Sequence, residues 1–176
     1  MKKVFLFICA LFCAFLAQAQ SDAIYLHNGT VIKGKVMKVA EHTVSYVYEN
    51  EEAEQTCGKY AVSKIVYGKS GREQNVTDKI VVRGKNDWDN VIVIENLEEV
   101  AGLKRQGEVK GKTAFINYRT AGGSDRKSLE YLKKEAAEMK CPFILLTSDK
   151  DIDRKGIDGG SFGQIQSIKK GIAYGY

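Results

Sequence analysis

The chain has 176 residues, of which 44% are hydrophobic and only one is proline. This composition excludes a wholly disordered chain and a proline-rich stalk. The formal net charge of +5, from 27 basic and 22 acidic residues, falls to +3 without Lys2 and Lys3, and this near balance excludes a polybasic arm for nucleic acid.

Residues 1–19 have the three-part pattern of a secretory signal peptide. Two lysines come first, residues 4–17 are uncharged and largely apolar, and Ala17 and Ala19 are the small residues that signal peptidase accepts. As a helix, this apolar stretch would span about 21 Å, less than the hydrocarbon core of about 30 Å, which favours a removable signal over an anchor. We expect cleavage before Gln20 and export to the periplasm or cell envelope of a Gram-negative bacterium. We expect no transmembrane segment in the mature chain.

Four cysteines are present, and two of them, Cys9 and Cys13, lie in the signal. Each follows a bulky residue, which is unlike a lipoprotein cleavage site, so a soluble exported protein is favoured over a lipid-anchored one. Cys57 and Cys141 remain in the mature chain. They could pair in an oxidising compartment, or they could be two buried, unreactive thiols, and the second interpretation is favoured.

Residues 20–78 follow the pattern of a small all-β module. Asn28-Gly29 is a strong signal for a hairpin, Gly34 lies where a long second strand must bend, and Val62–Lys64 is predicted to be a tight turn. Five short strands cannot form a sandwich, so we predict a highly bent five-stranded β-barrel. The expected strands are 22–27, 30–39, 43–48, 57–62 and 64–68.

Residues 79–176 are predicted to form an α+β domain with one main helix packed on a sheet. The helix is expected at 124–140, with Ser124 or Asp125 as its N-cap and Pro142 after its end. Its apolar face is defined by the helical spacing of Leu129, Leu132, Ala136 and Met139. Strands are expected at 79–84, 88–95, 107–112, 113–119, 142–148 and 165–176, with a charged, glycine-rich loop at 148–164. The predicted fold class is therefore α+β, a small five-stranded barrel followed by an α+β domain.

The segments LHNGTVIKGKVMKV, VSYVY and KIVYG resemble exported two-module envelope proteins of the Bacteroidetes type. They are similar to Sm-like and SH3-like small barrels. The resemblance implies the barrel fold. It does not carry RNA binding, because VAEHTVSY has neither the aspartate nor the asparagine of the Sm motif.

The segments EVAGLKRQGEVKGK, LKKEAAEMK and GIAYGY are similar to parts of the α+β domain of enterobacterial outer-membrane lipoproteins, including the Rcs sensor. That resemblance implies the fold of residues 79–176. The sequence departs from the family pattern at Lys140-Cys141 and at Gly175, and the family's paired disulfides and lipid anchor are absent.

Histidines, aspartates and a glycine-rich segment are the residues that could carry chemistry. His27 and His42 are interpreted as exposed turn residues, not as members of a catalytic triad. Asp149, Asp151, Asp153 and Asp158 invite a calcium interpretation, but Arg154 and Gly160 stand where an EF-hand loop needs glycine and glutamate. The glycines of 159–163 are interpreted as loop residues.

Aromatic residues offer a binding alternative. Trp88 is either a half-buried strand anchor or an exposed stacking platform for a sugar or peptide, and the anchor is favoured. The tyrosines of residues 20–78 are expected in or beside the barrel core. They are Tyr25, Tyr46, Tyr48, Tyr60 and Tyr67.

We therefore expect an exported, non-enzymatic cell-envelope protein that acts as a binding or interaction module for an envelope protein or a glycan, and not for nucleic acid. No catalytic, cofactor-binding or metal-binding residue is assigned. One alternative is an enzyme or enzyme accessory acting on cell-wall or glycan material, with Trp88 and the 149–158 segment as its site. Another is a structural subunit that recruits a partner by strand addition.

Overall fold

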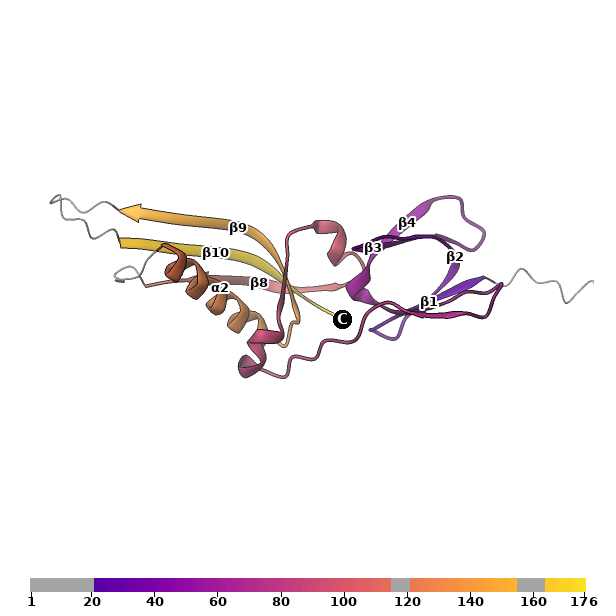
Figure 1. Ribbon diagram of the computed structural model, residues 1–176, viewed down its shortest axis with the longest axis horizontal. Helices are drawn as coiled ribbons and strands as arrows, with labels where there is room; N and C mark the ends of the chain where they lie inside the picture. Colours follow the sequence, from indigo (N-terminus) through magenta and orange to yellow (C-terminus); the bar gives the residue numbers. More distant parts are fainter. Residues whose placement is uncertain (1–20, 115–120, 155–163) are drawn as a thin grey trace, which may run out of the picture.

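The computed structural model describes residues 21–114, 121–154 and 164–176. These residues form two β-sheets that lie end to end along an elongated molecule, with one long helix beside the second sheet (Figure 1). The predicted signal peptide lies outside the described residues. None of the described helices is long and apolar enough to span a membrane.

The first sheet has six antiparallel strands in the order β4-β3-β2-β1-β5-β6. Its strands bury alternate side chains, so Ile24, Ile32, Val44 and Ile65 belong to one hydrophobic cluster. Its elements are β1 (Asp22–Leu26), β2 (Val31–Val39), β3 (Thr43–Tyr48), β4 (Glu54–Gly58), the 3-10 helix η1 (Lys59–Ala61), β5 (Val62–Val66) and β6 (Glu73–Asn75).

Two glycines shape the start of this sheet. The predicted Asn28-Gly29 turn joins β1 to β2, with Gly29 at φ +91° and the Thr30 N–H donating to Asn28 Oδ1 at 2.9 Å. At Gly34, a Cβ atom would lie 2.2 Å from the carbonyl oxygen of Val47, so only glycine lets β2 approach β3 this closely.

The predicted five-stranded barrel is wrong. Among the described residues the sheet is open, because β4 and β6 are its two ends and do not pair with each other. Residues 73–75 form an additional strand that occupies the side of β5 where β4 would have to pair to close a barrel. The predicted turn at Val62–Lys64 is also wrong, since the chain turns earlier, at η1, and these residues are in β5.

The second sheet has four strands in the order β7-β9-β10-β8, and β7 is parallel to β9 while the other pairs are antiparallel. Helix α2 packs against it, mainly over β8 and β10. The elements are the 3-10 helix η2 (Lys85–Asn90), β7 (Ile92–Ile94), the 3-10 helix η3 (Leu97–Val100), β8 (Lys104–Lys112), α2 (Ala121–Glu138), β9 (Phe143–Arg154) and β10 (Gln164–Gly175). The molecule is mostly β with one main helix, so the predicted combination of a barrel and an α+β domain is corrected.

Helix α2 begins earlier than predicted. Ser124 and Asp125 lie inside the helix and are not its N-cap. The helix ends at Glu138, two residues before the predicted end: Lys140 takes a positive φ of 58°, the Cys141 N–H bonds back to the last turn, and Pro142 follows as predicted.

Three other expectations for this part differ from the structure. Residues 79–84 form no strand, and of residues 88–95 only Ile92–Ile94 do, because η2 takes up the preceding residues. Strand β9 continues to Arg154, through residues predicted to be a loop, because β10 pairs with it along its length. The strand predicted at 113–119 falls largely outside the described residues.

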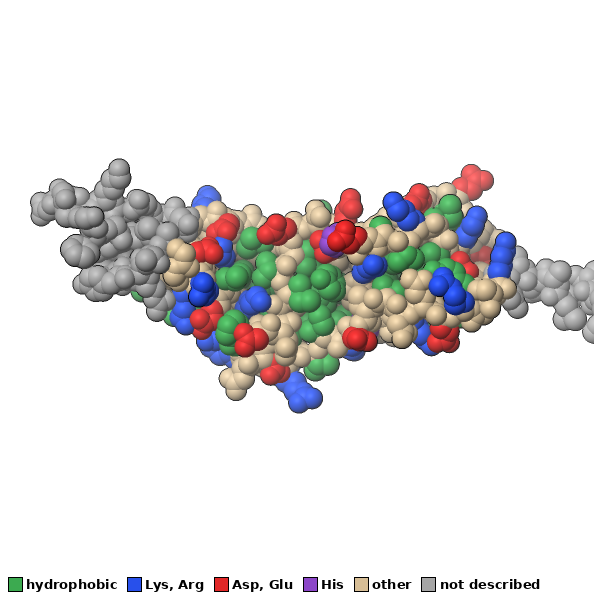
Figure 2. Space-filling view, viewed as in Figure 1, with side chains coloured by type: hydrophobic (Ala, Val, Ile, Leu, Met, Phe, Trp, Pro, Cys, Tyr) green, Lys and Arg blue, Asp and Glu red, His purple; other side chains and the backbone are tan. Residues whose placement is uncertain are grey.

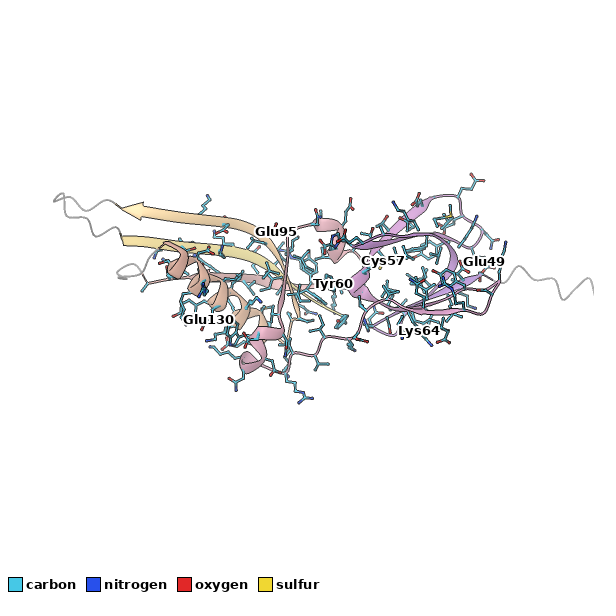
Figure 3. All side chains as sticks on the ribbon, in the orientation of Figure 1. Glu49, Cys57, Tyr60, Lys64, Glu95 and Glu130 are labelled. Atoms are coloured by element: carbon cyan, nitrogen blue, oxygen red, sulfur yellow. The ribbon has the colours of Figure 1, made fainter. Side chains whose placement is uncertain are left out.

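The two sheets meet at an apolar junction. The ring centroids of Tyr60, from η1, and Phe143, from β9, lie 5.1 Å apart, and Figure 3 shows Tyr60 between the two sheets. The Gly58 N–H donates to the Ala101 carbonyl at 2.9 Å, which ties the end of β4 to the chain after η3. Ring packing and backbone hydrogen bonds therefore join the two sheets directly.

Candidate functional site

His27 lies at the junction and serves as a contact between the sheets. It is half-buried, and its Nε2 lies 3.1 Å from Thr77 Oγ1 while its ring meets the Tyr176 ring edge-on at 4.9 Å. Burial, and then the charge of Lys79, lower the pKa of His27 from 6.5. The expected exposed turn position is therefore corrected to a half-buried one.

His42 is exposed, as predicted, and lies beyond the end of β2. Its Nδ1 lies 3.4 Å from Glu99 Oε2 and its Nε2 lies 3.8 Å from Glu41 Oε1. The structure places His27 against Thr77 and Tyr176, and His42 between two glutamates, so each imidazole has structural or surface partners.

Both cysteines of the described residues are free and buried. Cys57 belongs to the cluster of the first sheet and Cys141 to that under α2, so they do not pair. Burial raises the pKa of the Cys57 thiol to about 11 and also raises the pKa of the Cys141 thiol. The favoured interpretation of two buried thiols agrees with this arrangement.

Trp88 and Asp149, the described parts of the alternative glycan site, contact different parts of α2. Trp88 is in η2, packed against the core under the helix, with Lys134 Nζ 5.4 Å from its ring centre. Asp149 pairs with Lys169, which also pairs with Asp125. Since Asp125 and Lys134 are nine residues apart, these contacts lie about 13 Å apart along the helix, and the structure does not bring the two residues together.

Lys169 occupies a position that sequence reasoning missed. Its side chain is only 6% exposed and its Nζ lies 2.6 Å from Asp125 Oδ1, while Asp149 Oδ2 is its second partner. Burial alone would lower the pKa of Lys169, but the hydrogen bonds to both aspartates outweigh it and raise the pKa. Lys169 is thus a buried ammonium that links α2 and β9 through its two aspartates.

Hydroxyl groups fill the space next to Lys169, under the first half of α2. Ser128 Oγ lies 2.9 Å from Ser167 Oγ, and the Ser167 N–H donates to Thr113 Oγ1 at 3.1 Å. This end of the helix–sheet interface is polar, whereas the other end is the apolar cluster around Leu132 and Ala136. The buried polar residues are Thr113, Ser124, Ser128, Gln166, Ser167 and Lys169.

Within the described ranges, no group of three or more His, Cys, Asp or Glu side chains is placed to hold a metal ion. Of the aspartates considered for calcium, Asp149 pairs with Lys169 and Asp158 lies outside the described residues, as does the glycine-rich segment 159–163.

Hydrophobic side chains gather on the surface near the junction of the two sheets and over the first sheet (Figure 2). Leu97 of η3 is 69% exposed, Val81 is 55% exposed and Met37 of β2 is 53% exposed. The large hydrophobic residues exposed among those described are Val31, Met37, Tyr48, Val81, Leu97, Tyr131 and Met139.

Strand β8 is an edge of the second sheet. On one side it pairs with β10, and just after the end of β8 the Thr113 N–H donates to the Ser167 carbonyl of β10 at 3.2 Å. The Lys110 N–H points the other way and donates to Glu135 Oε2, on α2, at 2.6 Å. The sequence predicted a strand here, but its edge position depends on sheet order, which no local pattern encodes.

The chain matches no known family model and no curated protein sequence.

Proposed function

We propose that this chain is an exported, non-enzymatic protein of the cell envelope of a Gram-negative bacterium, which acts as a binding or interaction module for an envelope protein or a glycan. The pattern of residues 1–19 supports export. The observation that carries the binding role is strand β8, a nine-residue strand with exposed charged side chains at an edge of the second sheet.

The use of the reactive side chains supports a role without catalysis. His27 packs between the sheets, the two thiols are buried with raised pKa values, and Lys169 is held as a cation between two aspartates. Nucleophilic and acid–base catalysis need an accessible group with a suitable pKa. These groups instead make structural contacts.

A pull-down from detergent-solubilised envelope tests the proposal. The mature chain from Gln20 should carry its tag at the N-terminal side, because Tyr176, the last residue, packs in the junction. We expect one envelope protein or one glycan to be retained in a fixed ratio. Turnover of cell-wall glycan by the pure protein would contradict the proposal and favour the enzymatic alternative.

A further inference from the structure

The free side of β8 presents a row of backbone groups. In an antiparallel strand, successive N–H groups point to opposite sides, so the outward position of Lys110 implies that Glu108 and Lys112 also direct their N–H and C=O groups outward. Among the described residues, no strand lies on this side. The Lys110 N–H, the central one of this row, already donates to the carboxylate of Glu135.

The side chains along this edge are mainly basic. Glu108 is the one acidic residue of the strand, and Arg105 NH2 lies 3.4 Å from its Oε1. Such a charge pattern repels a basic strand and attracts an acidic one. The exposed basic residues of β8 are Lys104, Arg105, Lys110 and Lys112.

A cavity of about 310 Å³ lies beside this edge and is lined by residues of β8, β9 and β10. Its lining includes Glu108 and Lys110 of β8, Thr147 of β9, and Lys170 and Ile172 of β10. Ile172 supplies a half-buried apolar surface, and the two lysines outnumber the one carboxylate of the lining, that of Glu108. This lining suits an aliphatic side chain with acidic neighbours.

We propose that β8 binds an acidic, extended segment of a partner protein by strand addition, and that Glu135 competes with this segment for the Lys110 N–H. The inference rests on the proposed function and names the chemistry of its partner. Backbone hydrogen bonds to the edge supply affinity, while the basic side chains and the cavity supply specificity. In the free protein, Glu135 fills the position that a carbonyl of the added strand would take.

A second copy of the chain fits this edge less well. Two β8 edges would bring like charges together, which is unfavourable across a strand pair. The edge strand β4, with one glutamate, has only Glu54, Gln55 and Thr56 exposed, and the Gly58 N–H already donates to the Ala101 carbonyl. A separate acidic segment can instead run along the full strand.

Fluorescence anisotropy with a synthetic peptide tests the inference on the mature chain. The probe is a labelled peptide that alternates glutamate with threonine and carries one central valine. Two matched control peptides carry N-methyl groups on alternate residues, one peptide for each of the two possible registers. N-methylation removes backbone N–H donors but keeps every charge. We expect the first peptide to bind and N-methylation in one register to weaken binding about 10-fold or more.

Variants of α2 test the competition. Glu135→Ala should tighten peptide binding about 3- to 10-fold, because it frees one backbone donor and removes a negative charge. Glu138→Ala is the matched control, since Glu138 is also exposed on α2 but pairs with Lys85 away from the edge. Its effect should stay within about 2-fold.

Equal binding of the parent and N-methylated peptides would overturn strand addition and leave simple charge attraction. Absence of binding by the acidic peptide to both the parent and Glu135→Ala would overturn the inference entirely. A Lys110→Pro variant, verified as folded by circular dichroism, separates this result from the broader proposal. If it still retains the envelope partner in the pull-down, the binding role stands and the β8 edge is not the site.

Discussion

The hydroxyl of Tyr176 accepts a hydrogen bond from the backbone N–H of Ile80 at 2.9 Å. Tyr176 is the last residue, whereas Ile80 lies in the segment that links the two sheets. The Tyr176 ring also contacts the His27 ring, at 4.9 Å, and the Phe143 ring, at 5.5 Å. One side chain therefore holds three separate parts of the chain at the junction.

Removing the Tyr176 hydroxyl should destabilise this junction. Tyr176→Phe keeps the ring contacts but leaves the half-buried Ile80 N–H without its acceptor, and we expect a loss of about 1–2 kcal/mol in the free energy of unfolding. Urea unfolding followed by tyrosine and tryptophan fluorescence measures it. Tyr174→Phe, which removes a hydroxyl from a neighbouring ring of the same cluster, is the control. Equal midpoints for the two variants would contradict the assigned role.

The half-burial of His27 predicts a pH-dependent stability. Burial, and next the charge of Lys79, lower the folded-state pKa below 6.5, so below that pH the unfolded chain binds more protons than the folded chain. The stability contributed by the neutral imidazole is full above pH 6.5 and is lost as the pH falls through the folded-state pKa. Asp78 and Thr77 oppose the shift and reduce its size.

Urea unfolding at about pH 7.5 and about pH 5 measures this dependence. The parent protein should lose more stability on acidification than His27→Gln, which keeps a polar group near Thr77 but does not titrate. His42→Gln keeps His27 and is the control for replacing a histidine at the surface. A parent and a His27→Gln variant with the same acid loss would refute the prediction.

Local patterns predicted the elements whose signal is strong within a few residues. The Asn28-Gly29 hairpin, the apolar start of β9 and the helical spacing around Leu132 each occur where expected. These signals depend on turn chemistry and on periodicity, which short-range physics determines.

Other features could not be predicted because they depend on distant partners. Strand β6 is short and polar, and only its pairing with β5 makes it a strand. Ser124 and Ser128 continue the four-residue spacing of Leu132 and Ala136, so they lie on the buried face of α2, although Ser124 was predicted only as a possible N-cap. The signal in the sequence for their burial was this four-residue spacing.

The buried ammonium of Lys169 should depend on both of its aspartates. Asp125→Asn and Asp149→Asn each leave one of these two charged partners, whereas the double variant removes both from a side chain that is only 6% exposed. Both aspartates are about half exposed, so solvent already screens their charges. We expect the double variant to lose about 2–3 kcal/mol in the free energy of unfolding, more than the sum of the single effects. A double-mutant cycle of unfolding free energies measures this, and strict additivity would contradict it.

Both thiols should be protected in the folded protein. Cys57 has a pKa of about 11, and burial also raises the pKa of Cys141, so few thiolates exist at neutral pH and access is poor. A colorimetric thiol reagent should react slowly with the native mature protein and rapidly, with two equivalents, in denaturant. Rapid native labelling, or the mass of an internal disulfide, would show that these side chains are not placed as described.

Two glycines of β8 form a matched pair for testing how α2 packs on the sheet. A Cβ at Gly111 would lie 1.8 Å from the Ser128 carbonyl oxygen and 2.7 Å from the Leu132 nitrogen, both backbone atoms of the helix. At Gly107, the nearest atom would be Met139 Cε at 2.7 Å, the end of a flexible, exposed side chain. Gly111→Ala must therefore move the helix, while Gly107→Ala needs only a rotamer change.

We expect Gly111→Ala to lower the free energy of unfolding by about 3 kcal/mol, and Gly107→Ala to change it by less than about 1 kcal/mol. Thermal unfolding by circular dichroism compares the two. The chemical change and the strand are the same, so the difference reports the helix–sheet distance at each position. Similar melting temperatures would mean that α2 does not lie directly over Gly111, and the polar contacts of Ser128 and Lys169 would then have to be reassigned.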